Sequence, residues 1–152
     1  MKKIKSVCQF SIMMICLALG SAMAQTGYGI RAGVTGDPTQ FHFGGHFISD
    51  PIVQKLTFRP NLEIGVGSNT TNVAFNFEFA YPIRIPDKDF SVYIGAGPAL
   101  NLSRHGDPGR THTGGGFNML LGLEHKEGLF GEIKVGAFDS PDFKFTVGYT
   151  FR

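Results

Sequence analysis

The chain has 152 residues, 17% of them charged, and a formal net charge of +2 at neutral pH. Its length suits a single domain, and its near balance of charge argues against a basic surface for nucleic acid. Both cysteines, Cys8 and Cys16, fall in the first 24 residues, so the remainder is expected to form no disulfide and no thiolate metal site.

The first 24 residues have the pattern of a secretory signal peptide. Lysines open this segment, an apolar run follows from Phe10 to Leu19, and Ala22-Met23-Ala24 supplies small residues for cleavage. The run is shorter than the roughly 20 residues that a spanning helix needs, which argues against a retained membrane anchor. We therefore predict a signal peptide over 1–24 and one domain over 25–152. Without the segment's three lysines, 11 of the 14 basic residues remain against 12 acids, a net charge of −1.

Apolar and polar residues alternate in the first two predicted strands, residues 28–34 and 41–47. The turn Thr35–Thr39 separates them and contains glycine, aspartate and proline. Successive side chains of a strand point to opposite faces, so each strand has one apolar and one polar face. The polar face carries arginine and glycine in the first strand, and two histidines in the second.

The alternation is clearest between Leu56 and Ile83, where apolar residues take nearly every second position on both sides of Ser68–Thr71. This pattern predicts a hairpin with a wholly apolar face. Further alternating segments follow, and the longest loop between them is Ser103–His112. Because Pro60 and Pro98 lack a backbone N–H, we expect a bulge or irregular pairing at each. The predicted strands cover residues 28–34, 41–47, 56–66, 73–83, 90–102, 116–124, 129–137 and 143–151.

An even number of antiparallel strands can close into a barrel, and about 9 to 11 residues per strand are enough to cross a bilayer. The apolar face points inward in a soluble lipocalin-type barrel and outward in a membrane barrel. Here the polar face consists mainly of small residues and is too weakly charged for a soluble exterior, whereas the other face is rich in phenylalanine. We therefore predict an all-β fold, an eight-stranded antiparallel up-and-down transmembrane β-barrel.

The charged residues of the polar face are balanced in sign. Four are basic and four are acidic, which suits a packed lumen, because buried charges must pair. Eight strands enclose an interior too narrow for an open channel, so we predict a structural network that fills the barrel and disfavour an ion path. The predicted network comprises Arg31, Arg59, Glu63, Glu78, Glu124, Glu132, Lys134 and Lys144.

Histidines form the candidate metal ligands, and neither group has a strong metal signature. His42 and His46 share a polar face but are separated by roughly 13 Å on an extended strand, too far to chelate one ion alone. His105, Asp107 and His112 fall in the longest loop, and a solvated loop is the favoured interpretation. We expect no metal and no cofactor.

Two stretches, Tyr93–Leu100 and the ending Phe143–Arg152, resemble the small outer-membrane β-barrel family of the OmpA transmembrane domain, OmpX and the opacity proteins. The resemblance implies a Gram-negative outer membrane, with both termini facing the periplasm and loops such as Ser103–His112 facing outward. It also implies biogenesis through periplasmic chaperones and the barrel assembly machinery. The alternating last strand would carry the assembly signal, with Phe143, Phe145, Val147, Tyr149 and Phe151 as its residues; Arg152 follows, where the family has a terminal aromatic.

The expected role is structural or surface-interactive, with outer-membrane lipid around the barrel and a possible extracellular partner at Ser103–His112. Two alternatives remain open. One is a soluble periplasmic barrel that binds an apolar ligand inside. The other is a lipid A-modifying enzyme, for which Ser103 with His105 is the nearest nucleophile and base pair, without the expected His-x-Ser arrangement. We predict that the chain is not an enzyme.

Overall fold

The structure, a computed structural model, describes residues 26–37, 39–106 and 110–152. The predicted signal peptide, both cysteines and Asp107 lie outside these residues. Among the described residues, no helix is long and apolar enough to cross a membrane. The described strands are β1 (Gly27–Thr35), β2 (Gln40–Ile48), β3 (Pro51–Val53), β4 (Leu56–Gly67), β5 (Thr70–Arg84), β6 (Phe90–His105), β7 (Arg110–His125), β8 (Leu129–Phe138) and β9 (Phe143–Phe151).

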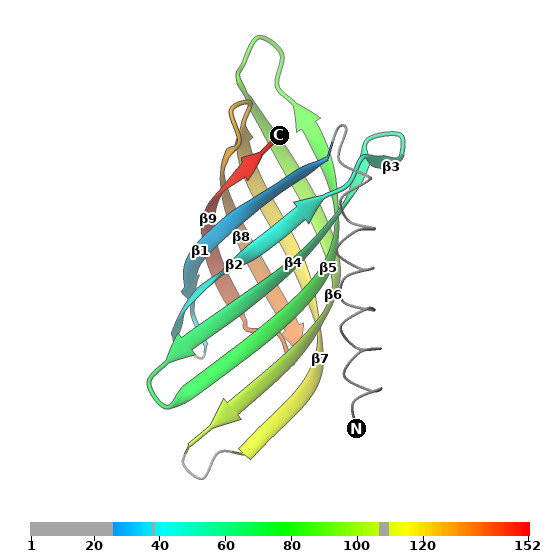
Figure 1. Cartoon of the computed structure of the whole chain (residues 1–152). Coiled ribbons are helices and arrows are strands. Elements are labelled where there is room, and N and C mark those ends of the chain that lie inside the picture. Colours follow the sequence, from blue (N-terminus) through cyan, green and yellow to red (C-terminus); the bar gives the residue numbers. More distant parts are fainter. Residues whose placement is uncertain (1–25, 38, 107–109) are drawn as a thin grey trace, which may run out of the picture.

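Antiparallel pairing joins the long strands into a closed ring. The order is β2-β1-β9-β8-β7-β6-β5-β4, and a further β2–β4 pairing closes it (Figure 1). The short β3 pairs with the start of β4 and does not belong to the wall. Eight of the described strands therefore form the barrel, and the predicted all-β, eight-stranded antiparallel fold is confirmed.

The described part of the predicted loop Ser103–His112 is mostly strand. β6 continues to His105 and β7 begins at Arg110, with Ser103 paired to His112 and His105 to Arg110. Pairing between the two backbones extends the hairpin through polar residues, where an alternating apolar pattern is absent. The prediction was wrong about where the strands end. The two strands stay paired beyond the last residue of the alternating apolar pattern.

Each of the two prolines interrupts pairing on one side of its strand. The β5–β6 pairing lapses between Asn76–Ala99 and Phe79–Ala96, beside Pro98, and resumes in the same register, so irregular pairing is confirmed there. At Pro60 the β4–β5 pairing is unbroken. On the other side, the β2–β4 pairing stops at His46–Asn61, although the Ser49 N–H donates to the Phe58 carbonyl in the same register. The ladder therefore lapses beside Pro60, which has no N–H to donate toward β2, and irregular pairing is confirmed on that side.

The apolar face of the strands points outward. Large hydrophobic side chains such as Met119 (63% exposed) and Phe77 (45%) line the outside, whereas Glu63 and Glu78 are 1% exposed inside. β1 begins and β9 ends at the end of the barrel that carries β3 and the β5–β6 turn (Figure 1). The β4–β5 and β6–β7 tips lie at the opposite end.

Candidate functional site

A carboxylate at the centre of the lumen binds groups from three other strands. Glu78 of β5 accepts hydrogen bonds at 2.7 and 3.0 Å from Lys134 Nζ of β8. It also accepts bonds from the side-chain amides of Asn61 (2.8 Å) and Asn118 (3.2 Å), which lie on β4 and β7. All four residues are buried, so the charges are balanced by direct partners rather than by water.

A second carboxylate, Glu63 of β4, lies among three cations. Lys144 Nζ is 2.8 Å from Glu63 Oε2, while Arg31 Nε and Lys134 Nζ lie 3.4 and 3.6 Å from Oε1. These cations come from β9, β1 and β8, none of which is paired with β4 in the wall. The ion pairs therefore cross the interior.

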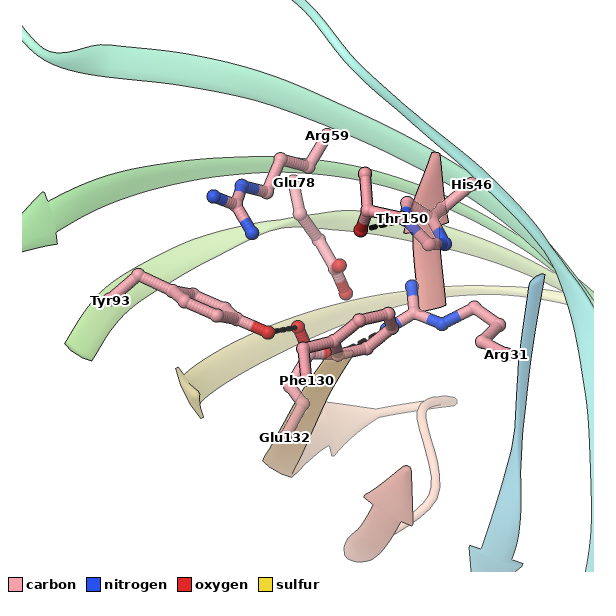
Figure 2. A pocket seen from close by; sticks show the side chains of 8 residues that line it. All are labelled: Arg31, His46, Arg59, Glu78, Tyr93, Phe130, Glu132 and Thr150. Carbon is pink, nitrogen blue, oxygen red and sulfur yellow. Dashed lines mark hydrogen bonds and ion pairs between the residues drawn. The ribbon is translucent and has the colours of Figure 1, made fainter. Parts of the chain in front are cut away.

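Glu132 of β8 extends this network toward the end of the barrel at which the chain terminates. It accepts a bond from Arg31 Nη2 and another, at 2.8 Å, from the hydroxyl of Tyr93 (Figure 2). The Tyr93 ring in turn lies 4.2 Å from the Arg59 guanidinium carbon, a cation–π distance. Arg59 pairs with Glu124 at 3.3 Å.

Glu124 also binds Arg152, the residue after β9. The structure thus brings all eight predicted charged residues into one connected interior set. The neutral members, Tyr93, Asn61, Asn76 and Asn118, were missed as site residues. In the sequence these residues lie at polar positions of the alternating pattern. The pattern shows which face of the strand a residue is on, and it does not show which residues it contacts.

The two lumen histidines each reach across β1 to β9. His42 lies between Thr35 Oγ1 (3.1 Å) and Thr146 Oγ1 (3.0 Å). His46 Nε2 lies 3.0 Å from Thr150 Oγ1. A Cβ at Gly29 would lie 2.6 Å from the His46 ring, so this glycine makes room for it. The two rings share no partner, in keeping with a filling role.

The interior leaves little free space near His46. A cavity of about 10 Å³ lies among Arg31, His46, Tyr93, Glu132 and neighbouring side chains (Figure 2). That volume is at the lower limit for one water molecule. Among the described residues, His46 Nδ1 has no hydrogen-bond partner, so a water there would satisfy it.

The loop candidates are not brought into one site. Ser103 Oγ donates to Asn72 Oδ1 at 3.3 Å, and no described contact links it to His105. His112 Nε2 lies 3.7 Å from Asp139 Oδ1, while Asp107 falls outside the described residues. Within the described parts of the chain, no group of three metal-ligating side chains is suited to a metal ion.

The five residues of the predicted assembly signal lie on the outer face of β9. Each is exposed, and β9 pairs with β1 on one side and β8 on the other. They therefore lie beside the seam where the first and last strands of the wall meet. The set is Phe143, Phe145, Val147, Tyr149 and Phe151.

One ion pair lies in the turns at the end of the barrel where the chain terminates. Lys126 Nζ is 2.9 Å from Asp89 Oδ1, and both side chains are exposed. The hydrogen bond from Lys126 lowers the pKa of the Asp89 carboxyl, and the same bond raises the pKa of Lys126. The pair joins the turn before β6 to the turn after β7.

A closed eight-stranded barrel with an apolar outside and a charged inside has the architecture of the small outer-membrane barrels. Two solved structures share this fold. The N-terminal β-barrel domain of Pseudomonas aeruginosa OprF matches with a TM-score of 0.61 and 14% identity, over 82% of this chain and 97% of that one. Neisserial surface protein A matches with a TM-score of 0.59 and 11% identity, over 82% and 90%. No family model and no curated protein matches the sequence.

Proposed function

We propose that the chain is an outer-membrane barrel whose lumen is closed by its charge network, with a structural or surface-interaction role. The observation that carries this proposal is the pairing of Glu63 and Glu78 with cations from strands that are not their neighbours in the wall. An ion path would have to break these pairs. Separating a buried pair leaves an uncompensated charge and costs roughly 3 to 5 kcal/mol.

Planar-bilayer recording tests the closed lumen. We expect the inserted wild-type protein to give no steady unit conductance, because the network occupies the cross-section. The conductance of the Lys134→Ala/Glu78→Ala double variant is measured beside that of the wild type. This variant removes the central ion pair without changing the net charge of the lumen. Steady conductance from the wild type would contradict a closed lumen.

The proposed location is the outer membrane, reached through the signal peptide at 1–24. The barrel assembly machinery would recognise the outer-face residues of β9, after periplasmic chaperones have carried the unfolded chain. The apolar exterior supports lipid contact, and the charged interior argues against a soluble barrel that holds an apolar ligand. Washing membranes with alkaline carbonate tests this location: we expect retention, and release would refute it.

A role without catalysis is part of the proposal. The enzyme alternative needs a nucleophile activated by a base, and Ser103 is bonded to Asn72 rather than to a histidine. Mass profiles of lipid A from cells with and without the protein should be the same, and a difference in acyl chains would favour the enzyme. An extracellular partner would bind at 103–112, a range whose described residues are the end of β6 and the start of β7.

A further inference from the structure

The outer wall of the barrel carries a single charged residue among the described strand positions. The alternation on β6 places Arg104 on the same outward face as Leu100 and Leu102. The other Asp, Glu, Lys and Arg residues of the described strands fall on the inward face. Arg104 is exposed, and no described acidic side chain pairs with it, in contrast to the charges of the lumen. Arg104 is therefore available to a partner outside the chain.

Two hydroxyl groups flank this arginine. In the ladders, Arg104 lies opposite Thr71 of β5 and opposite Thr111 of β7. Directly opposite residues have Cβ atoms about 4.5 to 5.5 Å apart and point to the same face. Thr71, Arg104 and Thr111 therefore form an outward row across three strands, which we call the Thr-Arg-Thr row. A guanidinium and two hydroxyls together suit a phosphate.

The height of the row matches a lipid headgroup. The outward residues of β6 run from Phe90 to Leu102, a rise of about 40 Å along the strand. At the roughly 45° tilt of membrane strands this is about 28 Å along the membrane normal, close to the roughly 30 Å of a hydrocarbon core. Arg104 follows two residues later, about 5 Å further out by the same rise and tilt, within the headgroup layer.

We propose that the Thr-Arg-Thr row binds the phosphate of a lipid headgroup in the outer leaflet. The proposal rests on the proposed outer-membrane location, and it names the lipid partner of one side of the barrel. Binding would fix the depth of β5, β6 and β7 in the membrane. The outward apolar residues of these strands would contact the hydrocarbon core, and Arg104 would contact the headgroup layer. The β6–β7 tip would then extend beyond the membrane.

Retention of phosphorylated lipid tests this inference. The protein is purified from the envelope, placed in nanodiscs of a phosphate-free galactolipid containing diphosphoryl lipid A or its dephosphorylated form, and analysed by native mass spectrometry. We expect selective retention of the diphosphoryl form, and roughly tenfold weaker retention by Arg104→Gln, because charge-assisted hydrogen bonds are lost. The matched control is Arg110→Gln, which removes an equal charge from the inward face of the same hairpin and should retain lipid like the wild type.

Equal retention by the wild type and Arg104→Gln would overturn the proposal, as would equal retention of both lipids. Full displacement of the lipid by millimolar inorganic phosphate would also overturn it, because the site would then take a soluble anion. Heat-dependent gel mobility checks that each variant is folded. Release of the wild type by carbonate would refute the location and this inference together, whereas failure of the lipid experiment alone leaves the location standing.

Discussion

The inner and outer faces of this barrel obey opposite rules. Inside, each carboxylate has named partners at hydrogen-bond distance, and the residues cannot be exchanged without leaving a charge alone. Outside, phenylalanine, leucine and valine side chains are exposed and need only remain apolar. The lumen therefore determines which strands lie opposite one another through specific charge pairs, whereas the outer face determines only that the barrel is surrounded by apolar material.

The largest effect is expected from Glu78→Ala. The substitution removes the main partner of Lys134, although Glu132 and Glu63 remain at 3.4 and 3.6 Å. We expect the free energy of unfolding to fall by about 3 kcal/mol, the lower end for a broken buried pair. The midpoint of heat-dependent gel mobility measures it. Phe77→Leu, its outward neighbour, serves as the control, and an unchanged midpoint for Glu78→Ala would contradict an interior role.

A charge placed on the outer face should cost nearly as much. Phe77 lies near the middle of β5, so Phe77→Arg is expected to destabilise the inserted barrel by about 2 to 3 kcal/mol, the lower part of the range for arginine at the bilayer midplane. Ile83→Arg, on the outer face near the end of the same strand, should cost at most about 1 kcal/mol. Urea unfolding in lipid vesicles measures both. Equal costs at the two positions would show that this face does not contact a hydrocarbon layer.

A larger side chain should also destabilise the barrel more on the inner face than on the outer face. A Cβ at Gly122 would lie 2.0 Å from the buried Tyr93 ring, whereas a Cβ at Gly115 would meet nothing within 4 Å. Both glycines belong to β7. Gly122→Ala should therefore cost about 1 to 3 kcal/mol, and Gly115→Ala should be nearly neutral. Thermal midpoints of the two variants give the comparison, which would fail if the outward substitution were the more harmful.

The smallest effect is expected outside the barrel wall, at Asp89 and Lys126. Because Lys126 lowers the pKa of Asp89 below its usual 3.8, the pair stabilises the fold above that pH and loses this contribution as pH falls through the lowered pKa. The thermal midpoint of Lys126→Gln should be slightly below that of the wild type at neutral pH. The two should converge in acid, and a gap that persists there would exclude this pair as its cause.

The sequence predicted the faces of the strands better than their contacts. Alternation between Leu56 and Ile83 was sufficient for the hairpin, because the period of two follows from backbone geometry alone. It could not predict that Tyr93 reaches Glu132, or that Asn61 and Asn118 share Glu78, since those contacts depend on which strands lie opposite across the lumen. The pairing of polar residues at the ends of β6 and β7, such as Ser103 with His112, was also missed. Pairing between backbones leaves no pattern in the hydropathy of the sequence.

The β1–β9 seam constrains how the chain can fold. Its pairs join residues 109 positions apart at Thr35–Lys144 and 123 apart at Tyr28–Phe151. Such high contact order makes ring closure slow and leaves it until the last strand has been synthesised. Until then both edges are open to pairing with other copies, so prematurely truncated products that lack β9 are expected to aggregate.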